Sequence, residues 1–252
     1  MQKVTRPVSP YYPSLPANRA GLPDVASDPV EYRGYFRIEA HPSQSVIYRP
    51  GDPADKVYVL RRGRVRLVRV GQTGTKSVLG ILRPGDLFGD LLRPEGAILD
   101  EFAIASGEAE VWSIDNHSFQ HLLESRPHLA LDVIRALNER NRAMRNRVLG
   151  LTFKEVPARL ADTLLVLADS HGERCPHGGE YDLRGITQQD LADLVGASRS
   201  FVSTLINEMK RDGLLGNVGR ILCIRDVRGV RERAAEEKCA SAQPTRASER
   251  AG

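Results

Sequence analysis

The chain has 252 residues, of which 41% are hydrophobic and 27% are charged, and its formal net charge is +4. Such a length holds one large domain or two ordinary ones, and the composition is typical of a globular protein rather than a disordered one. No apolar run reaches the roughly 18 residues of a membrane span, and Pro7, Pro10, Pro13 and Pro16 interrupt any signal-peptide core, so we expect a cytoplasmic protein without membrane contact.

The N-terminal half alternates between short apolar segments and turn signals. Residues 1–34 are rich in proline and small polar residues, and we predict a flexible extension there. In Arg64-Val65-Arg66-Leu67 the arginines would face outward and the apolar side chains inward. Many short strands separated by turns predict a β-roll over residues 35–126. The expected strands are Lys56–Leu60, Arg64–Leu67, Ser77–Leu82, Phe102–Ile104 and Glu110–Ile114.

A long amphipathic helix is expected next, over residues 127–151, with Pro127 in its first turn. Its apolar residues recur at alternating spacings of four and three, which is typical of a two-stranded coiled coil. Asn141 would be the polar residue that sets the register. The alternative is a helix that packs only on its own domain. We interpret the row as a dimerisation seam: Ala130, Ile134, Leu137, Asn141, Met144, Val148 and Leu151.

Another helix is expected near Val156 to Asp169, before a loop over residues 170–179. His171, Cys175 and His177 lie close together there, but their spacing matches no zinc motif. We therefore interpret this segment as a polar surface loop and expect no metal. The three cysteines of the chain are few, odd in number and far apart, so neither a disulfide framework nor a four-cysteine iron–sulfur cluster is indicated.

The most specific segment runs from Ile186 to Arg211 and predicts helix, tight turn, helix. Thr187 followed three residues later by Asp190 predicts a capping box. Gly196 suits the turn, and Ser198 suits the cap of the second helix. Four apolar residues at i, i+3, i+4 and i+7 form the buried face of that helix: Val202, Leu205, Ile206 and Met209.

The other face of the second helix carries short polar residues and one arginine near its N-terminal end. A DNA-recognition helix enters the major groove by that end, where arginine suits guanine. A β-hairpin wing with Arg220 near its tip follows, which completes a DNA-binding domain over residues 152–230 before a polar tail over 231–252. The candidate DNA-binding residues are Thr187, Gln188, Ser198, Arg199, Ser200, Ser203, Thr204, Asn207 and Arg220.

With these elements the sequence resembles the CRP/FNR family of transcription regulators over residues 38–228. The strongest parts of the resemblance are Thr187 to Leu215, the run from Gly85 to Asp90, and the order of roll, long helix and winged helix-turn-helix. The fold class expected is α+β. The resemblance implies a homodimer that binds a pseudo-palindromic DNA operator and contacts RNA polymerase.

Family members that bind cyclic nucleotides hold the phosphate with an Arg-Ser pair and the ribose with a Glu. The alignment places Leu99 and Asp100 at the Arg-Ser positions and Asp90 at the Glu position. Leucine cannot pair with a phosphate, and a carboxylate repels it. We therefore expect no obligate cofactor and no requirement for cyclic AMP. The effector pocket implied by the resemblance consists of Gly89, Asp90, Leu99, Asp100, Glu101, Met144 and Arg145.

Two other functional classes stay open at this point. One is a nucleotide-sensing regulatory subunit that acts through protein–protein contacts. The other is a metal-dependent roll oxygenase, which needs two or three histidines and a carboxylate inside the roll. His41 is the only histidine among residues 36–116. We therefore do not expect an enzyme.

Overall fold

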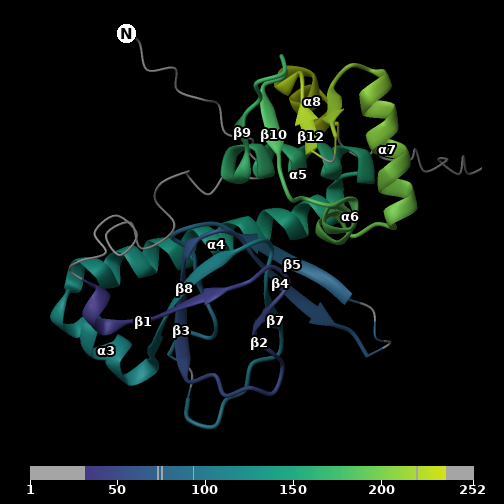
Figure 1. Cartoon of the computed structure of the whole chain (residues 1–252). Helices are drawn as coiled ribbons and strands as arrows, with labels where there is room; N and C mark the ends of the chain where they lie inside the picture. The colour runs from purple at the N-terminus through teal and green to yellow at the C-terminus, as the bar shows by residue number, and fades with distance from the viewer. Residues whose placement is uncertain (1–31, 73, 75, 93, 220, 237–252) are drawn as a thin grey trace, which may run out of the picture.

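The computed structural model describes residues 32–236 except 73, 75, 93 and 220. A β-rich N-terminal part packs against the long helix α4 (Pro127–Phe153), and a second part of helices and short strands follows it (Figure 1). The predicted α+β class with a roll, a long helix and a winged helix-turn-helix is confirmed. Among the described helices, none combines the length and apolar character that crossing a bilayer requires.

The roll consists of two four-stranded antiparallel sheets, with strand orders β1-β8-β3-β6 and β2-β7-β4-β5. All five expected strands are present, whereas β1, β2 and β6 were not among the expected strands. The strands are β1 (Arg37–His41), β2 (Val46–Tyr48), β3 (Lys56–Arg62), β4 (Val65–Val70), β5 (Lys76–Leu82), β6 (Leu87–Phe88), β7 (Phe102–Ala105) and β8 (Ala109–Asp115).

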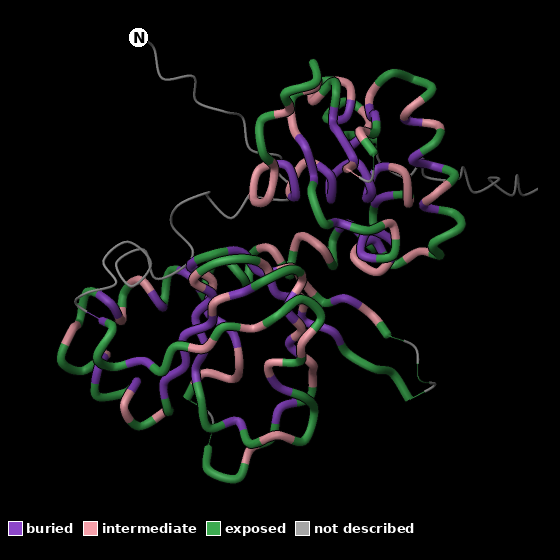
Figure 2. The backbone as a smooth tube through the Cα atoms, viewed as in Figure 1, coloured by how far each residue is buried: buried purple, intermediate pink, exposed green. Residues whose placement is uncertain are grey.

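Strand β3 is buried on both faces because it lies between two layers of core. Val57 and Val59 pack toward α3 (Asn116–Ser125) and α4 in a cluster with Trp112. Tyr58 and Leu60 point the other way, into the core between the two sheets. Figure 2 shows buried residues following the strands of the roll. Hydrophobic burial on both sides therefore fixes β3 as the central element of this domain.

The turn after β3 requires glycine for two reasons. Gly63 has a φ of +84°, in the left-handed region that L side chains avoid. The backbone of Glu108 also occupies the place where a Cβ of residue 63 would lie. This close approach lets the β3–β4 connection pack directly on the start of β8.

The ends of the roll and of the C-terminal part differ by a few residues from the predicted boundaries. Tyr32 is 1% exposed within the cluster around Trp112, so the extension predicted over 1–34 includes residues that belong to the roll; residues 1–31 lie outside the described ones. At the other end, α8 (Val227–Ala234) buries Val230 and Ala234. The tail predicted from residue 231 therefore begins too early, because two apolar residues among charged ones give little periodicity.

The C-terminal part is a winged helix-turn-helix domain around a single core of helix and strand residues. Its sheet has the order β11-β12-β10-β9. The elements are α5 (Val156–His171), β9 (Glu173–Arg174), β10 (Tyr181–Leu183), α6 (Gln188–Val195), α7 (Arg199–Arg211), β11 (Leu215–Val218) and β12 (Ile221–Ile224).

A buried ion pair ties the end of α4 to this domain. Lys154 follows α4 directly, and its Nζ lies 2.6 Å from Oδ2 of Asp162 in α5, with both side chains at most 1% exposed. The same ammonium donates to the carbonyl of Ala234 at the end of α8. The long helix and the C-terminal domain are thus joined by a short, well-packed connection.

Candidate functional site

The first helix of the helix-turn-helix begins with the predicted capping box. The backbone N–H of Asp190 donates to Oγ1 of Thr187 at 3.1 Å, and the backbone N–H of Thr187 donates to Oδ2 of Asp190 at 2.8 Å. Gly196 ends α6 in the left-handed conformation, with φ of +67°. Both local predictions are confirmed, and together they set the angle at which α7 leaves the turn.

The second helix, α7, starts at the predicted cap and buries the predicted face. Oγ of Ser198 accepts the backbone N–H of Phe201, and the four predicted apolar residues are buried. Figure 2 shows buried and exposed residues alternating along α7. The opposite face is therefore presented outward from a rigid core.

The outward face of α7 contains the predicted polar residues. Arg199, Ser200, Thr204 and Asn207 are exposed, and Ser203 is half-buried. The hydroxyl of Ser200 lies 3.1 Å from that of Ser198, and the hydroxyl of Thr204 donates to the backbone carbonyl of Ser200. Arg199 thus carries the longest of these polar side chains, and the amide of Asn207 is the other exposed group of the face that has no hydrogen bond to another described residue.

Three further predicted positions behave differently, and one residue was missed. Thr187 is exposed, but its hydroxyl donates to Asp190 at 2.8 Å, and Gln188 is half-buried. Arg220, predicted at the wing tip, lies outside the described residues. Phe201 is 44% exposed in the first turn of α7. Phe201 was not predicted because an apolar residue beside a polar face gives no distinct sequence signal. An exposed apolar side chain at this position suits contact with a thymine methyl group in the major groove.

The predicted seam of α4 is exposed in the single chain. Its five large apolar members are between 44% and 57% exposed: Ile134, Leu137, Met144, Val148 and Leu151. Ala130 is half-buried and Asn141 is exposed. Such a contiguous apolar row on a surface is typical of an interaction site.

A different side of α4 packs on the roll, and two of the helix's arginines lie on that side. Val133 and Ala136 are buried against the roll. Arg140 lines a cavity on this side, and Arg147 donates to the carbonyls of Leu79 and Asp193. Arg147 is half-buried in these contacts, whereas Arg140 is exposed.

The cavity has a volume of about 410 Å³ and lies where the roll, α4 and α5 meet. Of the predicted effector residues, Asp100, Glu101 and Met144 line it, whereas Gly89, Asp90, Leu99 and Arg145 do not. Leu99 is 3% exposed within the core of the roll. The position aligned with the phosphate-binding arginine is thus a core position in this chain.

The cavity wall carries charges of both signs. Asp100 forms an ion pair of 2.9 Å with Arg69 on β4. Glu101 accepts a hydrogen bond from Tyr48, and burial raises the pKa of Glu101 above its ordinary value. Arg69, Arg83, Arg140 and Arg147 also line the cavity. Sequence comparison of the effector loop alone missed these arginines because they come from β4, from the residue that follows β5, and from α4.

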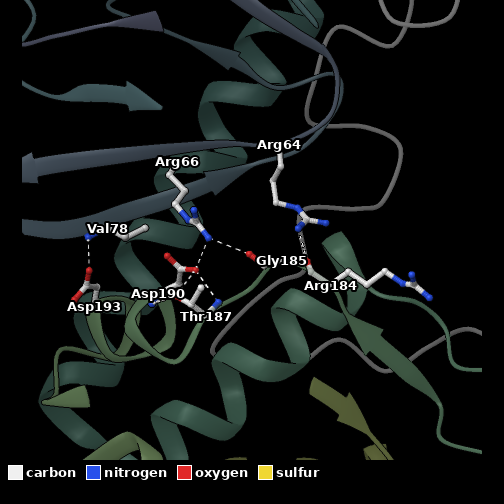
Figure 3. Close-up of polar contacts among 8 residues, drawn as sticks. All are labelled: Arg64, Arg66, Val78, Arg184, Gly185, Thr187, Asp190 and Asp193. Atoms are coloured by element: carbon white, nitrogen blue, oxygen red, sulfur yellow. Dashed lines mark hydrogen bonds and ion pairs between the residues drawn. The ribbon is translucent and has the colours of Figure 1, made fainter. Parts of the chain in front are cut away.

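The roll touches the helix-turn-helix directly through β4 and β5 (Figure 3). Nη2 of Arg66 lies 2.7 Å from Oδ2 of Asp190 and also donates to the carbonyl of Gly185. Arg64 donates to the carbonyl of Arg184, and Asp193 accepts the backbone N–H of Val78. The predicted alternation on β4 is therefore correct, but the arginines face the C-terminal domain rather than solvent.

The segment predicted as a polar surface loop is partly ordered and partly buried. Ser170 and His171 belong to α5, and residues 173–174 form β9. Sγ of Cys175 lies 3.1 Å from Sγ of Cys223 on β12. Donor atoms of Cys175, His177 and Asp182 lie within 4.8 Å of one another. His171 is not part of this group; it lines the cavity. Cys239 lies outside the described residues.

Both parts of the chain match known families. Residues 38–126 match the family described as cyclic nucleotide-binding domain, and residues 158–233 match the Crp-like helix-turn-helix domain. The chain is 30% identical over 182 residues to the global nitrogen regulator of Synechococcus elongatus, which covers 71% of this chain and 82% of that protein. It is 29% identical over 194 residues to the CRP-like cAMP-activated global transcriptional regulator of Mycobacterium tuberculosis, covering 77% and 86%.

Solved structures give the same result for the fold. A CRP-family transcriptional regulator from Thermus thermophilus superimposes with a TM-score of 0.67 at 26% identity, covering 79% of this chain and 97% of that one. A CooA variant from Carboxydothermus hydrogenoformans superimposes with a TM-score of 0.69 at 24% identity, covering 85% and 96%.

Proposed function

The chain belongs to the CRP/FNR family of transcription regulators, and on that premise we propose that it binds a pseudo-palindromic DNA operator as a homodimer. The observation that carries the proposal is the outward face of α7. Its exposed polar residues lie over a fully buried apolar face, with Arg199 in the first turn. The N-terminus of the helix adds amide donors and a partial positive charge that suit phosphate. These features match the demands of a recognition helix in the major groove.

The exposed apolar row of α4 supports the homodimer. Removing such residues from water is favourable by roughly 25 cal/mol for each Å² of apolar surface, and the part of this energy that exceeds the entropy lost on association stabilises the complex. A second copy of α4 offers the complementary row, because a two-fold contact uses the same surface twice. Asn141 would then fix the register of the pair. Two copies of α7 would contact half-sites about 34–36 Å apart, one helical turn of DNA.

We propose that DNA binding does not require cyclic AMP. Leu99 offers no group for a phosphate and lies in the core of the roll. Asp100 and Glu101 place two carboxyl groups on the cavity wall, and Arg69 is already paired with the first. The other arginines of the cavity wall, Arg83, Arg140 and Arg147, could instead bind a different anionic effector in the same cavity.

RNA polymerase is the proposed protein partner, because a regulator bound to its operator acts on transcription through the polymerase. We assign no catalytic reaction to this chain. Its role is recognition of DNA, with the roll as the sensing domain.

Selection of binding sites with the purified full-length chain tests the proposal. We expect an enriched sequence with two-fold symmetry, bound by two chains per duplex without added nucleotide. Binding to that duplex should exceed binding to a scrambled duplex by ~10³-fold or more at physiological salt. Equal binding to both duplexes would contradict sequence-specific recognition. No binding to either would favour a regulatory subunit that acts through protein contacts.

A further inference from the structure

One face of the wing sheet carries sulfur and carboxylate groups close together. Asp182 on β10 pairs with Cys223 on β12, and β9 pairs with the other edge of β10 just before Cys175. Leu183, Leu222 and Ile224 point to the opposite face, into the core of the domain. The strand pairing therefore gathers Cys175, Asp182 and Cys223 on the side away from that core.

Asp182 is a buried carboxylate beside the thiol of Cys223, which is only a weak donor. The residue is 0% exposed, and neither of its carboxylate oxygens has an N–H or O–H hydrogen-bond partner in the part of the chain that the structure describes. Nη2 of Arg184 lies 3.9 Å from Oδ2 of Asp182, beyond hydrogen-bond distance. Burying a charge in this way is costly unless a cation or donors offset it. The surroundings of Asp182 are thus suited to a bound cation.

The loop over residues 176–180 closes this side of the sheet, and His177 is among its exposed residues. A Cβ on Gly179 would collide with Sγ of Cys223 and lie 3.3 Å from Sγ of Cys175. Only a residue without a side chain lets the backbone pass so close to both sulfurs. Nδ1 or Nε2 of His177 then lies within 4.8 Å of both Sγ of Cys175 and a carboxylate oxygen of Asp182.

We propose that Cys175, His177, Asp182 and Cys223 bind a zinc ion. Thiolate sulfur, imidazole nitrogen and carboxylate oxygen are the ligands that zinc uses, and four of them complete a structural tetrahedral site. Two thiolates on a tetrahedral zinc lie about 3.8 Å apart, as follows from Zn–S bonds of about 2.3 Å. Binding therefore needs the two sulfurs to separate by less than about 1 Å, with loss of their protons to solvent. It also needs the donors to draw together around the ion, because only those of Cys175, His177 and Asp182 lie within 4.8 Å of one another, and Sγ of Cys223 is not in that group.

The zinc would join the β9–β10 hairpin to a strand that is distant in sequence. Cys175 and His177 lie in the connection between β9 and β10, Asp182 lies on β10, and Cys223 lies on β12. A structural ion at this point would fix the β9–β10 loop on the strand that forms the wing. This inference is independent of the DNA target and of the oligomeric state.

Cobalt substitution in the reduced, full-length chain tests the site directly. We expect the visible absorption of tetrahedral Co²⁺ together with a near-ultraviolet thiolate-to-cobalt band, both lost when stoichiometric Zn²⁺ is added. Cys175→Ser and Cys223→Ser should each weaken the thiolate band, and Asp182→Asn should weaken metal affinity by about 10-fold or more. Cys239→Ser and His128→Gln, outside the site, are the matched controls.

Alkylation of the unaltered chain provides a second measurement that does not depend on how variants fold. With iodoacetamide and peptide mass mapping, Zn²⁺ should slow modification of Cys175 and Cys223 by at least about 10-fold, because a coordinated thiolate is shielded. Cys239 should react at the same rate with and without zinc. Gly179→Ala, which keeps all four donors, should reduce this protection.

Three outcomes would overturn the proposal. One is a cobalt spectrum that persists in both serine variants, and another is equal alkylation of all three cysteines with and without Zn²⁺. The third is loss of two thiols that only a reductant restores, in a chain that takes up no Co²⁺ after reduction. That result would assign Cys175 and Cys223 to a disulfide instead.

Discussion

The guanidinium of Arg66 lies 2.7 Å from the carboxylate of Asp190, with the two side chains 14% and 5% exposed. This carboxylate also accepts the backbone N–H and the hydroxyl of Thr187. One side chain of α6 therefore orders the first turn of the helix-turn-helix and holds it against β4 of the roll (Figure 3). The orientation of the DNA-binding domain depends on a contact that the roll provides.

Arg66→Ala should loosen the contact between the roll and the helix-turn-helix. Removing a hydrogen-bonded partner from a mostly buried carboxylate costs about 1–3 kcal/mol, which urea unfolding would measure. The domain connection near Lys154 should also become more sensitive to limited proteolysis. Arg69→Ala removes a pair whose members are 58% and 65% exposed, and should cost at most about 1 kcal/mol. Equal effects of the two substitutions would contradict the role of Arg66.

Met144→Glu should convert the dimer into monomers. Two copies of the new carboxylate would face each other in an apolar seam, where desolvation makes like charges costly. Light scattering at micromolar concentration would report the mass, and specific DNA binding should fall with it. Arg142→Glu changes an exposed residue of the same helix outside the seam and should leave the dimer intact. If light scattering showed that the unaltered protein is a monomer at the same concentration, the proposed dimer would be wrong.

Arg199→Ala should cost about 1–3 kcal/mol at the selected operator and relax preference at one base pair per half-site. Arg220→Ala should instead weaken cognate and scrambled duplexes about equally, and lower the salt slope by about one unit, because a phosphate contact is not sequence-specific. Titrations of both duplexes at two salt concentrations separate these cases. If Arg199→Ala weakens both duplexes equally, Arg199 contacts the backbone rather than a base.

Cyclic AMP should change operator affinity by less than about threefold. A ligand shifts a conformational equilibrium only through different affinities for the two states, and Leu99 and Asp100 provide no binding group for the cyclic phosphate. Fluorescence anisotropy with a labelled operator, with and without cyclic AMP, measures the effect. A shift of about tenfold or more, equivalent to 1.4 kcal/mol, would show that the cavity arginines bind the nucleotide.

His171 should make stability depend on pH. Burial, with smaller contributions from Arg64 and Arg83, lowers the pKa of His171 to about 4. The unfolded chain, with an ordinary histidine pKa near 6.5, therefore binds more protons between these values, and stability falls as pH decreases through that window. Between pH 7.5 and 5 the loss should be about 2 kcal/mol. In His171→Gln this dependence should disappear, whereas the exposed His128→Gln should retain it; an unchanged slope in the first variant would contradict the assignment.

Local features of the fold could be predicted from the sequence because short-range interactions determine them. The capping box of Thr187 and Asp190 needs residues three apart, and the buried face of α7 needs a period of 3.6. The turn at Gly196 and the apolar row of α4 follow from the same local rules. None of these features required knowledge of distant contacts.

Only the tertiary structure decided which surfaces meet. Alternation placed Arg66 correctly on the outer face of β4, yet its partner Asp190 is 124 residues away, and no local pattern links them. The same holds for Cys175 and Cys223, which strand pairing brings to 3.1 Å. Local periodicity tells which way a side chain points, whereas hydrophobic packing of one domain on another determines what it contacts.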